Sequence, residues 1–76
     1  MTTFDFLSMI ETQEFVDFEF KYKALCEVEN GKFFFFKGTF FQANGDPNRE
    51  LRICENLRGE TKIIPNAWNV SAVMNY

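Results

Sequence analysis

The segment VENGKFFFFKGTFF, residues 28–41, decides how this chain folds. Four phenylalanines, Phe33 to Phe36, form one unbroken run, and Phe40 and Phe41 follow after three intervening residues. Because side chains alternate across a strand, the run places large apolar rings on both faces of whatever sheet it joins. One face must hold the core. We expect the other to need a cover that a short chain can hardly provide.

The dipeptide Asn30-Gly31 sits just before this run and is typical of a two-residue type I′ hairpin turn. Upstream of it, residues 16–28 carry an apolar side chain at every even position, which predicts a long half-buried strand. Pairing Glu29 with Lys32 across the turn sorts the rings into two rows. The row expected to face inward contains Phe20, Tyr22, Cys26, Val28, Phe33, Phe35 and Phe41.

The segments on either side supply the remaining elements. Thr2 and Thr3 are suitable helix caps, and the apolar stripe that follows predicts a helix over residues 4–13. Residues 44–48 read NGDPN and predict a loop, because Gly, Pro, Asn and Asp all favour turns.

Three further patterns lie beyond that loop. Residues 50–57 predict a strand with two chemically different sides: one side carries Leu51, Ile53 and Leu57, and the other carries Arg52, Cys54, Asn56 and Arg58. A strand at Ile63-Ile64 should end at Pro65, which suits a sheet edge. The tail from Trp68 to Tyr76 alternates like a last strand, with a short helix starting near Asn66 as the alternative.

Together these elements predict an α+β fold, with an N-terminal helix packed on a twisted antiparallel meander of four to five strands. Residues 1–76 are expected to form a single domain. The composition, with 46% hydrophobic and 25% charged residues, is that of an ordinary globular protein. The start of the chain lacks the features of a secretory signal, so we expect a cytoplasmic protein.

The residue types exclude most catalytic chemistry. The chain has no histidine, which is the commonest general base and the usual partner of a nucleophilic Ser or Cys. Two thiols, Cys26 and Cys54, are too few for a structural zinc site, and we expect both to be unpaired, buried and inert. The four glycines are scattered and make no phosphate-binding loop. We therefore expect no catalytic residues, no metal and no cofactor.

The second face of the predicted sheet is the candidate binding site. Phe34, Phe36 and Phe40, with Leu25 beside them, would form an apolar island. Its rim would hold charged side chains, namely Lys21, Lys23 and Glu27. Such a patch favours a larger protein as the partner. The alternative is that these rings are buried after all, either because the chain's own C-terminal segment, with Trp68 and Tyr76, folds over them or because the sheet curls around them.

The expected function is that of a non-enzymatic inhibitor or adaptor, of the kind that viruses and mobile elements use against host proteins. A single-stranded nucleic-acid platform is the alternative, with bases on the three rings and phosphates on basic side chains. Those side chains would be Lys21, Lys23, Lys37, Arg52 and Arg58. The net charge of -3 disfavours it. A homodimer or a larger homo-oligomeric structural subunit is a third possibility.

Overall fold

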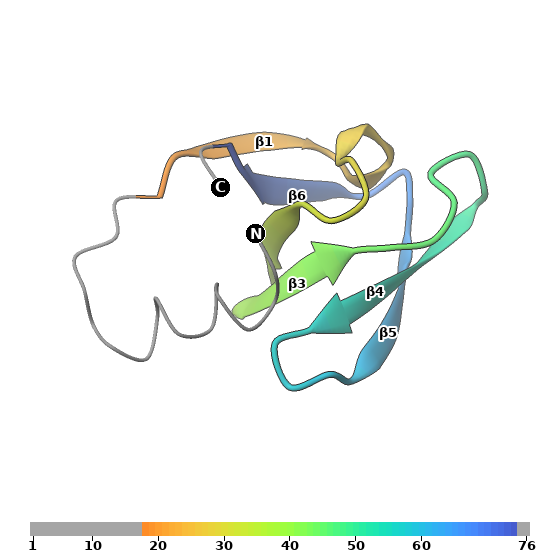
Figure 1. Cartoon of the computed structure of the whole chain (residues 1–76). Coiled ribbons are helices and arrows are strands. Elements are labelled where there is room, and N and C mark those ends of the chain that lie inside the picture. The colour runs from red at the N-terminus through yellow and green to blue at the C-terminus, as the bar shows by residue number, and fades with distance from the viewer. Residues whose placement is uncertain (1–17, 75–76) are drawn as a thin grey trace.

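The computed structural model describes residues 18–74, which form one six-stranded antiparallel sheet (Figure 1). A three-residue 3₁₀ helix, η1, is the only helical element among these residues. No helix in this part of the chain is long and apolar enough to cross a membrane. The elements are β1 (Phe20–Ala24), η1 (Leu25–Glu27), β2 (Phe33–Phe36), β3 (Thr39–Ala43), β4 (Leu51–Asn56), β5 (Thr61–Pro65) and β6 (Asn69–Val73).

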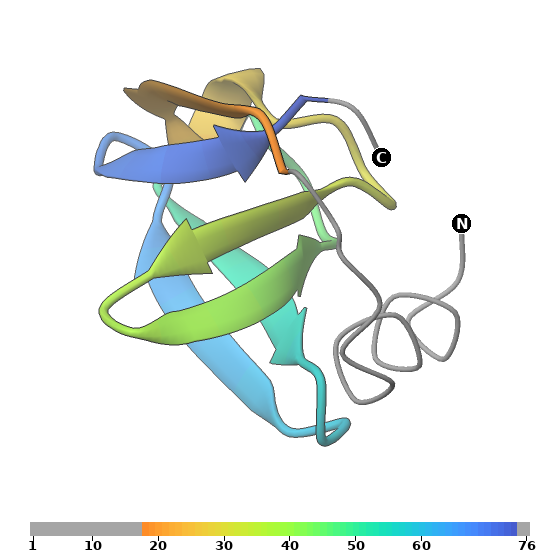
Figure 2. The same ribbon diagram turned by 90° about the vertical axis from the view of Figure 1, so that its left-hand side faces the viewer.

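The sheet curls into a partly open barrel (Figure 2). Its strand order is β1-β6-β2-β3-β4-β5, so β5 and β6 stand four positions apart. In a flat sheet that separation would be about 19 Å, at about 4.8 Å per strand. Yet a tight turn joins the two strands, in which the Trp68 N–H donates to the Pro65 carbonyl at 3.1 Å. The ends of such a turn lie within about 7 Å, so the sheet has to bend round on itself.

This architecture corrects the expected α+β meander. Strands β2 to β5 do form a meander, but the last strand, β6, returns to lie between β1 and β2. The described residues are therefore an all-β structure, and the α+β prediction is wrong. The helix predicted over residues 4–13 lies outside the described residues.

The predicted hairpin at Asn30-Gly31 is also wrong, because β1 pairs with β6 and not with β2. A turn does form there, with the Lys32 N–H donating to the Glu29 carbonyl at 3.1 Å, but it connects η1 to β2. The two-residue hairpin instead joins β2 to β3 through Lys37 and Gly38. Both have positive φ angles, 49° and 79°, as a type I′ turn requires.

The long strand predicted over residues 16–28 ends at Ala24, and residues 16 and 17 lie outside the described part. The chain then turns into η1, where the Leu25 and Cys26 N–H groups donate to the carbonyls of Trp68 and Asn66. This change of direction breaks the alternation on which the predicted register depended.

Later parts of the sequence were easier to predict. The loop at residues 44–48, the strand within residues 50–57 and the strand ending at Pro65 are all confirmed. The tail forms a strand, β6, with Val70 and Ala72 buried, so the helical alternative is wrong for residues 69–73.

The main core fills the inside of the barrel, which we call the inner face. It is built from small and medium apolar side chains around a stacked phenylalanine pair, Phe34 and Phe41, whose ring centroids are 5.5 Å apart. The members are Leu25, Val28, Phe34, Phe41, Ala43, Cys54, Ile64, Val70 and Ala72, with half-buried Phe36 packed against them.

A charged side chain, Arg52 of β4, lies inside the same barrel with 0% of its surface exposed. Its Nη1 donates to the Leu25 carbonyl at 2.7 Å, and its Nε donates to the Asn44 carbonyl at 2.9 Å. Its Nη2 donates to Oδ1 of Asn30 at 2.7 Å. One guanidinium thus ties η1, the turn before β2 and the loop after β3 to strand β4.

A buried amide, Asn66, closes the neighbouring end of the barrel. Its Nδ2 donates to the carbonyls of Asp46 and Arg49, at 3.2 and 2.7 Å. Its backbone N–H donates to the Glu50 carbonyl at 3.0 Å. The β5–β6 turn is therefore anchored to the β3–β4 loop, which keeps the curled sheet shut.

Replacing Arg52 should test its role in the fold. We expect Arg52→Met to lower the free energy of unfolding by about 3 kcal/mol, because it leaves the buried Leu25 carbonyl without a donor and also removes the hydrogen bonds to Asn44 and Asn30. The free energy of unfolding of Arg52→Lys should lie between those of the wild-type chain and Arg52→Met, since one ammonium cannot reach all three acceptors. Urea unfolding measures the effect, with exposed Arg58→Met as a control that should stay within about 0.5 kcal/mol. Equal midpoints for the Arg52 and Arg58 variants would contradict this role.

Two glycines separate backbone strain from steric fit. Gly31 and Gly45 both have positive φ, 88° and 73°, so alanine at either should cost about 1–2 kcal/mol. A Cβ at Gly31 would meet nothing within 4 Å, whereas one at Gly45 would stand 3.2 Å from the backbone nitrogen of Ile53. We expect Gly45→Ala to be the more destabilising by about 1 kcal/mol or more in urea unfolding. Equal losses of unfolding free energy in the two variants would show that the β3–β4 loop moves easily to make room for the added Cβ.

Candidate functional site

The predicted apolar island does not exist as one surface. Leu25 and Phe34 are fully buried in the main core, so neither can reach a partner while the chain is folded. Phe36 is half-buried on the inner face, and Phe40 is half-buried on the opposite, outer face of the sheet. The prediction failed because the pairing of β1 with β6 leaves Phe34 on the inside, while Phe33 and Phe35 face out.

The predicted rim residues are likewise scattered. Lys21 and Lys23 lie on β1 opposite Ala72 and Val70, so they share the inner side of this edge strand. The carboxylate of Glu27 accepts the Ala24 N–H at 3.1 Å and so closes η1. Of these three residues, only Lys23 and Glu27 line a common hollow.

Rings gather on the outer face over β1, β6, β2 and β3, and we call them the outer aromatic cluster. Phe33 and Val73 are buried at its base. Phe40 contacts Phe35 edge-on at 4.9 Å and stacks on Phe20 at 6.4 Å between ring centroids. The sequence correctly placed large rings on both faces of the sheet, but of the three named anchors only Phe40 belongs to this cluster. Its members are Phe18, Phe20, Phe33, Phe35 and Phe40, with Val73 and Leu57.

A second apolar surface, which the sequence analysis missed, covers the outer face of β4 and β5. Leu51, Ile53 and Ile63 are 53%, 53% and 64% exposed, and we call them the aliphatic strip. Ile53 stands directly opposite Ile63 in the β4–β5 ladder. The alternation in residues 50–57 was recognised, but nothing in it indicated that the side with Arg52 and Cys54 would face the core. The apolar side is consequently exposed.

Strand β5 also presents a backbone edge. Hydrogen-bonded and non-hydrogen-bonded pairs alternate along an antiparallel ladder. The Asn56 N–H donates to the Glu60 carbonyl at 2.9 Å, which makes that pair a hydrogen-bonded one. By this alternation the N–H and C=O groups of Thr61 and Ile63 point away from β4. Among the described residues β5 pairs with β4 alone, so these groups form an open edge next to the aliphatic strip.

The exposed Trp68 is part of a different arrangement, at the tips of two turns. Its ring lies 5.9 Å from the Phe36 ring, and the Lys37 ammonium stands over both rings, at 5.2 Å from Trp68 and 5.4 Å from Phe36. These cation–π contacts link the β2–β3 turn to the β5–β6 turn. Trp68 thus packs beside Phe36, one of the rings that the C-terminal segment would cover in the alternative to a binding site.

The alternative function, a nucleic-acid platform, loses two of its parts. Phe34 has no exposed ring face on which a base could stack, and Arg52 donates its hydrogen bonds to three acceptors within the chain. Lys37 covers the rings of Phe36 and Trp68, where a base would have to lie. The arrangement of rings and cations therefore gives little support to single-strand binding.

The described residues contain no group of three or more Asp, Glu or Cys side chains placed to hold a metal ion. Both cysteines are free, which confirms the expectation that they are unpaired. Cys54 is buried in the core, and this burial raises the pKa of its thiol. Cys26, on η1, is exposed, which corrects the expectation that it is buried.

The two thiols should differ sharply in reactivity. A thiol reagent such as DTNB at pH 8 should label one cysteine of the native chain rapidly and the second only as the chain unfolds, because access and a raised pKa both protect Cys54. Cys26→Ala should abolish the rapid phase and Cys54→Ala should leave it intact. Two rapid equivalents in the native wild-type chain would refute this assignment.

Comparison of the chain with protein-family models, with curated proteins and with solved structures found no match. Its geometry therefore carries the functional argument.

Proposed function

We propose that this chain is a non-enzymatic protein-binding module, acting as an inhibitor or adaptor, which receives an extended segment of a larger protein along strand β5. The observation that carries the proposal is the pairing of an open backbone edge with the exposed aliphatic strip. Exposed contiguous apolar surface on a small protein is typical of an interaction site.

Each half of this surface supplies a different part of binding. The N–H groups of Thr61 and Ile63 can donate hydrogen bonds to an extended segment, and their C=O groups can accept them, whatever the sequence of that segment. The aliphatic strip, with Leu51, Ile53 and Ile63, adds selectivity for segments with apolar side chains at alternate positions. This division is how added strands are recognised in general.

A second copy of the chain fits this edge less well. A symmetric antiparallel pairing of two β5 strands around Ile63 would place Thr61 of one copy opposite Pro65 of the other. Pro65 has no N–H, so each such pair would lose a hydrogen bond. With a proline-free partner segment only this chain's own Pro65 lacks a donor, so one hydrogen bond is lost where the symmetric pair loses two. This comparison favours a different protein as the partner.

The test is capture from extracts of cells in which the chain occurs, using tagged wild-type chain and single variants. Ile63→Asp and Ile53→Asp should each weaken capture of the partner by tenfold or more, because a charge replaces an apolar contact at the centre of the interface. Tyr22→Asp is the matched control, since Tyr22 is 71% exposed on the other edge strand, and it should bind normally. Thermal melting should be nearly unchanged in all three.

Capture alone would not support the proposal; the pattern across variants would. Hydrogen exchange on the purified complex should protect the amides of Thr61 and Ile63 but not that of Tyr22. Equal capture by all variants, or capture of nothing, would overturn the proposal. Light scattering that shows a dimer sensitive to Ile63→Asp would instead establish self-association.

A further inference from the structure

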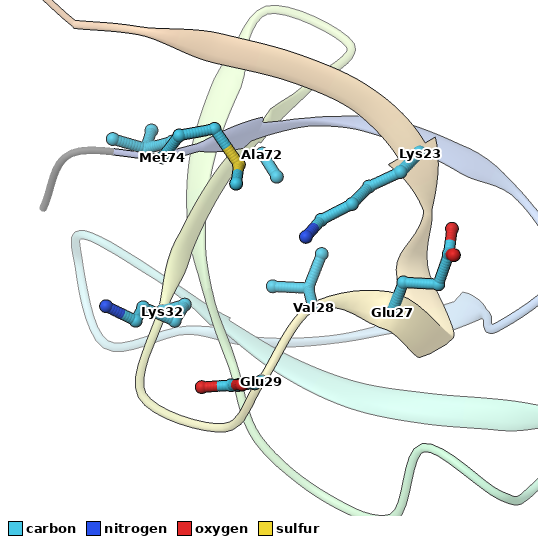
Figure 3. A pocket seen from close by; sticks show the side chains of 8 residues that line it. Lys23, Glu27, Val28, Glu29, Lys32, Ala72 and Met74 are labelled. Atoms are coloured by element: carbon cyan, nitrogen blue, oxygen red, sulfur yellow. The ribbon is translucent and has the colours of Figure 1, made fainter.

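A hollow of about 260 Å³ opens on the side of the barrel, between the edge strand β1 and the segment that leads into β2 (Figure 3). Among residues 18–74 no strand closes the inner face at this point, because β1 pairs with β6 and not with β2. The volume is slightly below the range of about 300–1,000 Å³ for drug-sized ligands, so the hollow suits a smaller molecule. Its walls come from Lys23, Glu27, Val28, Glu29, Lys32, Ala72, Val73 and Met74.

The floor of the hollow is apolar. Val28 and Ala72 belong to the main core and are almost fully buried, so a molecule that enters reaches the core itself. Met74 stands at the edge of this floor and is partly exposed. Its flexible thioether side chain can adjust to an apolar group of variable shape.

Of the four charged side chains that line the hollow, that of Lys23 extends across its opening. Lys23 is half-buried, and Figure 3 shows its ammonium extending across the opening towards Val28. The ion pairs found among residues 18–74 join Arg49 to Asp46 and Lys62 to Glu60, so none involves Lys23. A half-buried ammonium that has no carboxylate partner attracts an anion that enters the hollow, and the two form a charge-assisted hydrogen bond.

Neither acidic residue of the hollow forms an ion pair with Lys23. Glu27 is held by its hydrogen bond to the Ala24 N–H, and its carboxylate lies against the backbone of β1. Glu29 projects from the opposite wall, at the margin, close to Lys32 in sequence. A cationic ligand would meet the Lys23 ammonium at the centre, whereas an anionic one would be attracted to it.

We propose that this hollow binds a small carboxylate with a short apolar tail. The carboxylate pairs with the Lys23 ammonium, and the tail lies on Val28, Ala72 and Met74. This site is separate from the β5 edge, lies at the other edge of the sheet, and does not depend on the protein-binding proposal.

The experiment is an NMR titration of the ¹⁵N-labelled chain with hexanoate, and in parallel with hexanol and hexylammonium. Hexanoate should shift the amide signals of Val28, Ala72 and Met74 in a saturable manner, and hexanol should bind on the order of tenfold more weakly because it lacks the charge. Hexylammonium should not shift these signals.

Two lysine variants complete the test. Lys23→Gln should weaken hexanoate binding by on the order of tenfold, while Lys21→Gln, two residues away on the same side of β1 and outside the hollow, should leave it unchanged. Melting curves verify that both variants fold. The proposal is overturned if hexanol binds as well as hexanoate, if both variants behave alike, if the shifts fall on the aliphatic strip, or if hexanoate causes no shifts.

Discussion

A single buried guanidinium holds the barrel together. Arg52 reaches from β4 to the Leu25 carbonyl, the Asn44 carbonyl and the Asn30 side chain, which belong to η1, the loop after β3 and the turn before β2. Loss of hydration lowers the pKa of Arg52 from its usual value, yet an arginine side chain stays protonated in proteins. Such a charge is tolerated inside only because its donors find acceptors. The curled sheet, the short η1 helix and the turn at Asn30 all converge on it.

The same residue explains why an apolar surface is exposed. Side chains alternate along β4, so placing Arg52, Cys54 and Asn56 inside forces Leu51 and Ile53 outside. Ile63, opposite Ile53, then extends this surface to the open edge of β5. Closure of the barrel and exposure of the aliphatic strip are therefore two consequences of one strand orientation. The hollow beside Lys23 follows from the strand order, because β6 lies between β1 and β2.

Local signals in the sequence predicted local structure. Loop residues 44–48, the boundary at Pro65 and the alternation of the last strand are each fixed by neighbouring residues, and each is confirmed. Pairing between distant strands was not predictable in this way. Asn30-Gly31 is a stronger type I′ turn signal than Lys37-Gly38, because a lysine rarely adopts the positive φ that Lys37 has. Placing the hairpin at Asn30-Gly31 reversed the prediction of which residues among Phe33 to Phe36 face the core. Burial of Arg52 could not be foreseen, because its three acceptors become neighbours only in the closed barrel.

The most direct test of this account is the exchange of the Arg52 side-chain protons with water, measured by NMR on the ¹⁵N-labelled native chain. The account predicts resolved Nε–H and Nη–H signals that exchange far more slowly than those of Arg49 and Arg58, because all three nitrogens are hydrogen-bonded and the side chain has no exposed surface. Exchange as fast as that of Arg58 would mean that the guanidinium reaches solvent. The barrel would then be held closed by something else.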